Sequence, residues 1–185
     1  PHPYAPFVEL LRGYEERAGV PQEGALAALW QDACILLGLG GAGASAERAA
    51  LLQQGSPADA QTNVFELLSQ LLQALARQRS LLLVVDDLQF ASPTTLQLFH
   101  YLARNIRRER ILLLGLYRPE ELLPGMAGGA HPLRETLRRM GREQLYQEIP
   151  LRPLTEEEVG QIAAEALNVL ALDGEFTALL QREVE

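Results

Sequence analysis

The residues best suited to chemistry are two adjacent carboxylates and an arginine, each placed directly after a short apolar run. Asp86 and Asp87 follow Leu81–Val85, and Arg118 comes soon after the run 111–116. Carboxylate oxygens are ligands that Mg²⁺ prefers, and a neighbouring carboxylate can orient or activate a water molecule. An apolar strand that ends in two acids is therefore typical of a Walker B motif. Many parallel strands also end in Asp because that end meets solvent or caps a helix, so both interpretations stay open at this point.

Two strands joined by one helix must position these side chains. Both apolar runs are too short for a lone helix and rich in branched residues, which predicts strands buried on both faces. Ser92 can cap a helix and Pro93 fits its first position. Apolar residues then recur at helical spacing, at Leu96, Phe99, Leu102 and Ile106. The order strand, helix, strand predicts a right-handed parallel crossover, and ligands bind beyond the carboxyl ends of such strands.

Lysine is absent from the chain, since all 16 basic side chains are arginine. A phosphate-binding loop of the form GxxxxGK[ST] needs its lysine to reach the β- and γ-phosphates, so these residues cannot supply one. The glycine-rich stretch Gly38–Ser45 follows no predicted strand. It is interpreted as a turn between helices.

Composition limits the classes of protein to which the chain can belong. With 185 residues, 48% of them hydrophobic, the chain is long enough for one domain and part of another. It has no apolar run that could span a bilayer and no basic-then-apolar leader, which predicts a soluble cytoplasmic protein without a membrane partner. Net charge is −8, and residues 151–185 carry 8 acids against 2 bases, so direct nucleic-acid contact is not expected. The single Cys34 is expected to be a small core residue.

Helical periodicity fills most of the remaining chain. We expect helices within 1–20, 24–39, 47–54, 63–78, 132–140, 155–167 and 174–185. Capping boxes are predicted at Asn63 with Glu66 and at Thr155 with Glu158. A third strand is predicted over 145–151.

Longer strings around these motifs resemble a known family. The string LLLVVDDLQFASPTTLQLFHYLAR, followed by ILLLGLYRPEEL and IPLRPLTEEEVGQIAAEAL, closely resembles the ATPase core of bacterial STAND-type proteins of the AAA ATPase superfamily. These signal-transduction ATPases occur in large LuxR-type transcription regulators, in adenylate cyclases and beside protein kinase domains. The similarity covers most of residues 60–170, in matching order and spacing.

The resemblance implies an α/β fold, namely a P-loop NTPase-like parallel sheet with flanking helices and the strand order 5-1-4-3-2. The chain is expected to begin downstream of its Walker A motif and to supply strands 3, 4 and 5, near 81–86, 111–117 and 145–151. Strand 1, between strands 4 and 5, would then be missing.

The same resemblance implies a division of the chain. Residues 1–150 would form a partial ATPase core, made of a helical segment over 1–60 and a Walker B and sensor region over 61–150. Residues 151–185 would begin a helical lid subdomain.

By resemblance, the site would bind ATP with Mg²⁺. Asp86 would hold the metal, Asp87 would activate the attacking water, and Arg118 would sense the γ-phosphate. Arg118 could instead be a surface arginine that pairs with Glu120 or Glu121. A basic cluster also follows on the helix predicted after residue 131, and one member could be an arginine finger or all could be ordinary surface residues: Arg134, Arg138, Arg139 and Arg142.

Three positions depart from the family pattern. Phe90 and Ser92 stand where Trp and Asp are common, and Leu116 stands where Thr is common. Without that hydroxyl, hydrolysis could be slow or absent.

Two functions follow from these observations. The first is an ATP-driven switch in a bacterial regulator, which would act on effector domains of the same polypeptide, DNA-binding or cyclase, and could form homo-oligomers. The second is a degenerate, non-hydrolysing scaffold for protein interaction. A DNA-loading ATPase is disfavoured by the acidic balance. The 185 residues alone are predicted to be inactive in ATP hydrolysis, because the phosphate cradle is missing.

Overall fold

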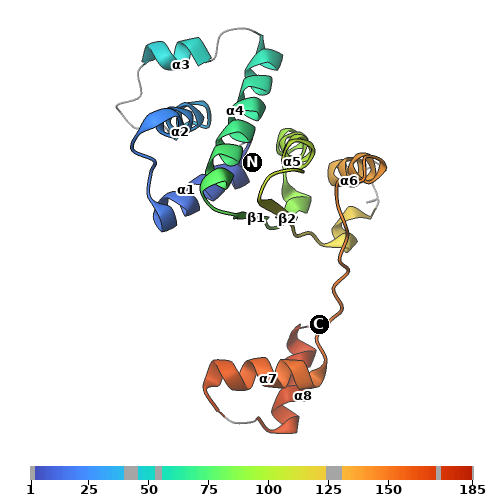
Figure 1. The fold of residues 1–185 in the computed structure, drawn as a ribbon. Coiled ribbons are helices and arrows are strands. Elements are labelled where there is room, and N and C mark those ends of the chain that lie inside the picture. Colours follow the sequence, from blue (N-terminus) through green and yellow to red (C-terminus); the bar gives the residue numbers. More distant parts are fainter. Residues whose placement is uncertain (1–2, 40–45, 53–55, 124–130, 170–171, 185) are drawn as a thin grey trace. The chain divides into compact units, whose positions relative to one another are not determined.

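In the computed structural model the chain forms two compact units, Pro1–Tyr146 and Gln147–Glu185 (Figure 1). The residues described are 3–39, 46–52, 56–123, 131–169 and 172–184. The first unit combines helices with a small parallel sheet, and the second contains two helices.

The sheet consists of two parallel strands, β1 (Leu81–Val85) and β2 (Ile111–Gly115), paired residue by residue along their length. Helix α5 (Pro93–Asn105) connects them. Its first turn is stabilised as predicted, because Pro93 occupies the first turn and the Ser92 hydroxyl accepts the backbone N–H of Thr95 at 3.2 Å. The strand–helix–strand arrangement predicted from the sequence is therefore confirmed.

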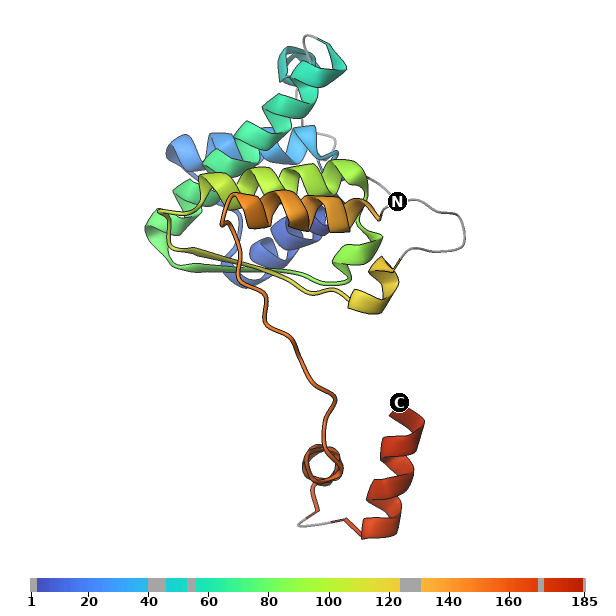
Figure 2. The same cartoon turned by 90° about the vertical axis from the view of Figure 1, so that its right-hand side faces the viewer.

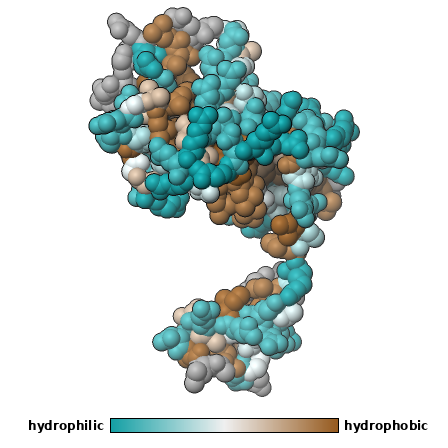
Figure 3. Space-filling view, in the orientation of Figure 1, coloured by the Kyte–Doolittle hydropathy of each residue, from teal (hydrophilic) through white to brown (hydrophobic). Residues whose placement is uncertain are grey.

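The prediction that both faces of these strands are buried is wrong. Leu83 and Val85 are 7% and 1% exposed, whereas the side chains that alternate with them on β1 face outward, as do the residues paired with those on β2. The outward residues are Leu82, Val84, Leu112 and Leu114, which are 60%, 39%, 63% and 36% exposed. Figure 2 shows α4, α5 and α6 on one side of the strands, and Figure 3 shows hydrophobic side chains gathered at the surface near them. One face of the sheet is thus covered and the other is an open apolar surface.

Helix α4 (Pro57–Gln78) packs against α2 and α5 in the core of this unit. Its buried side chains include Leu68, Leu71, Leu72 and Leu75. The predicted start near Asn63 is wrong by about two turns. The real cap is Ser56, which exchanges hydrogen bonds with Asp59 in a capping box, while Asn63 lies inside the helix and donates to the Leu52 carbonyl at 3.3 Å. No helix in the described part of the chain is long and apolar enough to cross a membrane.

Helices α1 (Ala5–Ala18), α2 (Gly24–Leu36) and α3 (Ala46–Leu52) complete the helical part before the strands. Of the predicted turn at 38–45, residues 40–45 lie outside the described part. A bidentate ion pair connects α3 to α2. Arg48 donates to both oxygens of the mostly buried Asp32 carboxylate at 2.5 and 2.7 Å. Paired geometry of this kind is the form in which arginine and carboxylate interact most strongly.

The third predicted strand is not formed. After α6 (Pro132–Arg142), residues 145–155 have no regular secondary structure, and the sheet in the described residues has two strands. A strand is stabilised by backbone hydrogen bonds to a neighbour. No described segment offers the neighbour that the expected sheet order places there, so the local pattern at 145–151 has nothing with which to pair.

The second unit pairs α7 (Glu156–Leu167) with α8 (Gly174–Val184). The predicted capping box is confirmed, because Glu158 donates its backbone N–H to the Thr155 hydroxyl and its carboxylate accepts the Thr155 N–H. A methyl group added to Gly160 would meet Thr177 Cγ2 at 3.0 Å, so the absence of a side chain there lets the helices approach.

Glu158 makes this unit sensitive to acid. Hydrogen bonds from Arg152, at 2.7 and 2.6 Å, and then from the Thr155 backbone lower the pKa of Glu158 from 4.5 to about 2. The folded pKa lies below the unfolded one, so the stabilisation is complete above pH 4.5 and is lost as the pH falls through about 2. We expect Arg152→Gln to raise the pKa of Glu158 and to move this loss to higher pH.

The measurement is a carboxyl ¹³C NMR titration of Glu158 in both proteins. Arg182→Gln, which removes an exposed arginine from α8, is the matched control and should leave the titration of Glu158 unchanged. A pKa near 4.5 for Glu158 in the unaltered chain would contradict the contact between Arg152 and Glu158.

Candidate nucleotide site

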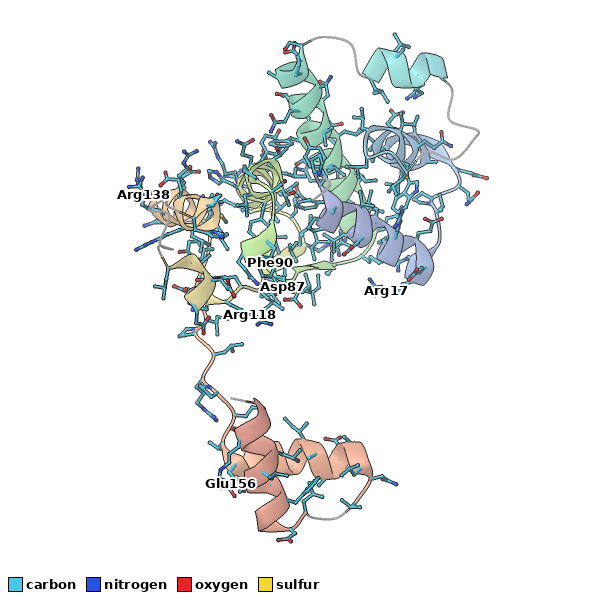
Figure 4. The ribbon with its side chains drawn as sticks, turned by 180° about the vertical axis from the view of Figure 1, so that it is seen from behind. Arg17, Asp87, Phe90, Arg118, Arg138 and Glu156 are labelled. Carbon is cyan, nitrogen blue, oxygen red and sulfur yellow. The ribbon has the colours of Figure 1, made fainter. Side chains whose placement is uncertain are left out.

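The residues that follow β1 and β2 share one edge of the sheet. Pairing continues beyond the strands, because Leu116 donates its N–H to the Val85 carbonyl and Leu88 donates to the Leu116 carbonyl, both at 2.9 Å. The structure therefore brings the segment after β1 beside the segment after β2. Figure 4 shows Asp87 and Arg118 at this edge.

Asp86 and Asp87 are both exposed but have different backbone conformations. Asp87 has φ 50° and ψ 42°, a left-handed conformation that costs a residue with a side chain about 1–2 kcal/mol. It begins the short 3₁₀ helix η1 (Leu88–Phe90), and its own N–H donates to Asp86 Oδ1 at 2.8 Å. Asp86 therefore directly follows β1, while Asp87 lies at the start of η1.

Gln89 joins the two sides of this edge, and sequence reasoning missed it. Its side chain is 3% exposed, its Nε2 donates to Asp87 Oδ1 at 2.8 Å, and its Oε1 accepts the backbone N–H of Arg118 at 3.2 Å. The only signal in the sequence was a polar residue among the apolar and aromatic positions of the turn. That signal says nothing about what the amide contacts.

Arg118 is exposed and directly precedes the 3₁₀ helix η2 (Pro119–Leu122). Within the described residues its side chain takes part in no ion pair, so the alternative pairing with Glu120 or Glu121 is not found. Its guanidinium is thus available to an anion at the sheet edge.

The three departures from the resembled pattern have different consequences. Ser92 still caps α5, so the loss of Asp there leaves the helix start intact. Phe90 is 64% exposed, which is unusual for so large an apolar ring, and Figure 4 shows it near Asp87. Leu116 is 37% exposed and brings no hydroxyl to the edge.

The arginines outside this edge have structural partners in several cases. Arg110 donates to the Ala76 and Arg77 carbonyls at the end of α4, and Arg104 pairs with Glu143 at 3.3 Å. The Arg110 contacts satisfy carbonyls at the C-terminus of α4.

The arginine-rich helix α6 is partly neutralised by one acid. Arg138 and Arg139 both pair with Glu135, at 2.8 and 3.1 Å. These contacts lower the pKa of Glu135, with the hydrogen bond from Arg139 as the largest cause.

A hollow of about 320 Å³ lies between α1 and α2, away from the strand ends. It is lined by Trp30 and Cys34 among other residues. Burial, and then the charge of Glu15, raise the pKa of the Cys34 thiol. Cys34 is partly buried and packs against the core instead of lying inside it, and the raised pKa disfavours the reactive thiolate.

Comparison with known protein families matches residues 2–114 to the family described as AAA ATPase domain. The chain belongs to the AAA ATPase domain family. No curated protein and no solved structure matches the chain. The matched region of this AAA ATPase domain contains Asp86 and Asp87 and ends within β2, before Arg118.

Membership of the family associates this AAA ATPase domain with ATP binding and hydrolysis and with Mg²⁺. The residues present fit such a metal. Mg²⁺ in nucleotide sites is held by one or two carboxylates together with waters and substrate phosphates. Asp86 offers one exposed carboxylate, and its Oδ1 accepts a hydrogen bond from the Asp87 N–H. The described residues contain no group of three or more His, Cys, Asp or Glu side chains that could hold a metal ion by themselves.

Proposed function

We propose that this AAA ATPase domain is part of an ATP-driven signalling switch of the STAND type, and that its nucleotide site lies at the carboxyl ends of β1 and β2. The observation that carries the proposal is that Gln89 joins Asp87, after β1, to the backbone of Arg118, after β2. Ligands of open parallel sheets bind at this edge.

Each residue at the edge has a proposed role. Asp86 holds Mg²⁺, which when bound neutralises charge on the β- and γ-phosphates. Asp87 orients the attacking water and accepts its proton as the oxygen bonds to the γ-phosphorus and the bond to the β-phosphate oxygen breaks. Arg118 senses the γ-phosphate by a charge-assisted hydrogen bond.

The lysine that cradles the phosphates comes, in this proposal, from residues other than these 185, because the sequence contains none. The open apolar face of the sheet supports this view. Parallel sheets are almost always covered on both faces, and Leu82 and Leu112 are more than half exposed on this one. A segment that carries a GxxxxGK[ST] loop and its helix would cover them. Residues 151–185 are proposed as the start of the lid whose position depends on the bound nucleotide.

The test compares Mg²⁺-ATP binding by two proteins in a calorimeter. One is the 185-residue chain, and the other is a loop-bearing protein, meaning a polypeptide that contains these 185 residues together with a GxxxxGK[ST] loop. We expect binding by the loop-bearing protein and at best weak binding by the 185 residues. If neither protein binds, the switch is refuted. The second candidate, a non-hydrolysing scaffold, is then favoured by two observations. The open apolar face could bind another protein, and Leu116 brings no hydroxyl to the proposed phosphate site.

A further inference from the structure

The turn after β1 contains a buried amide whose two ends face different segments. Gln89 is 3% exposed, and each end of its side chain has one partner, the Asp87 carboxylate and the Arg118 backbone N–H. The orientation of the amide is fixed by these partners. A backbone N–H can only donate, so the oxygen must face Arg118 and the nitrogen must face Asp87.

This amide continues the sheet beyond its last backbone pair. The pairing of Val85 with Leu116 and of Leu116 with Leu88 is followed by a side-chain bridge from Gln89 to Arg118. The same amide engages one oxygen of Asp87, whose left-handed backbone has its own conformational cost. A hydrogen bond to a charged group is among the stronger ones, so the contact fixes which Asp87 oxygen remains open to water.

We propose that Gln89 is a positioning residue that holds the Asp87 carboxylate for water activation and couples it to the segment bearing Arg118. This inference rests on the proposed function. When the γ-phosphate leaves, a change in the position of the Asp87 carboxylate is transmitted to the Arg118 backbone through the single buried side chain of Gln89. Gln89 itself touches neither nucleotide nor water.

Two substitutions separate the two ends of the amide. Gln89→Met keeps a side chain of similar length and removes both contacts. Gln89→Glu keeps an acceptor for the Arg118 N–H and replaces the donor to Asp87 by a second carboxylate, which repels the first.

The first measurement is amide hydrogen exchange in the 185-residue chain. Gln89→Met should remove the protection of the Arg118 amide, and Gln89→Glu should retain it. The Leu116 amide, which bonds to Val85, should stay protected in both variants and reports that the sheet is intact. If the Arg118 amide stays equally protected in Gln89→Met, the proposal is overturned, whether or not the protein binds and hydrolyses ATP.

The second measurement is ATP hydrolysis by the loop-bearing protein. We expect both variants to lower kcat by roughly tenfold to a hundredfold, the factor that loss of a hydrogen bond to a charged group gives, with KM unchanged. Asp87→Asn is the reference. If Asp87→Asn lowers kcat and Gln89→Met does not, the role of Gln89 is overturned alone. If Asp87→Asn has no effect, the proposed role of Asp87 is overturned, and the catalytic role of Gln89 with it.

Discussion

Asp86→Ala is expected to lower the Mg²⁺-dependent ATP turnover of the loop-bearing protein by about a hundredfold or more, the scale on which a single group that stabilises transition-state charge acts. The reason is that Asp86 is the proposed carboxylate ligand of the metal. Steady-state hydrolysis at saturating Mg²⁺ measures the effect. Glu66→Ala, which removes an exposed acid from α4, should leave turnover unchanged.

A second variant distinguishes a metal ligand from a structural acceptor. Asp86 also accepts the Asp87 N–H at 2.8 Å, a contact that asparagine can keep through its side-chain oxygen. If the metal role is right, Asp86→Asn loses nearly as much turnover as Asp86→Ala, because the negative charge is gone in both. Recovery of turnover in Asp86→Asn would assign Asp86 to the turn and refute the metal role.

Leu83→Ala is expected to cost about 2–5 kcal/mol of unfolding free energy in the 185-residue chain, the range for a leucine removed from a packed core. Leu83 is 7% exposed, on the covered face of β1. The adjacent Leu82 is 60% exposed, so Leu82→Ala should cost only about 0.5 kcal/mol, as surface changes do. Urea unfolding followed by circular dichroism measures both.

The same pair of variants tests how the open face is used. If a loop-bearing segment covers that face, Leu82→Ala should become costly in the loop-bearing protein while the cost of Leu83→Ala stays similar. Equal costs of the two variants in the 185-residue chain would contradict the one-sided sheet. A cost of Leu82→Ala that stays small in the loop-bearing protein would contradict the proposed cover.

The elements that sequence reasoning found are those with local signals. Helix α5 carries a cap, a proline in its first turn and a 3.6-residue apolar period, all within 93–105, and the strands are short apolar runs. The start of α4 differs from the predicted start at Asn63 because two capping patterns occur close together there, at Ser56 with Asp59 and at Asn63 with Glu66. The first turns after Ser56 are polar and carry no apolar stripe, so the sequence pattern indicates the later start at Asn63.

Features that depend on distant contacts could not be predicted in the same way. The run Leu81–Val85 is apolar throughout, so it has no alternation that would reveal an uncovered face. Residues 145–151 have strand-like composition, but a strand also needs a neighbour. The bridge made by Gln89 depends on the left-handed turn at Asp87 and on the register of β2, neither of which is encoded near that residue.

The central claim is that nucleotide and metal bind where β1 and β2 end, and paramagnetic NMR with Mn²⁺ in place of Mg²⁺ tests it most directly. In the loop-bearing protein, Mn²⁺-ATP should broaden the amide signals of residues 86–89 and 116–118, while those of α3 stay sharp. Mn²⁺-ADP should broaden the same signals. Broadening confined to other segments, or none at the strand ends with ATP bound, would contradict the account.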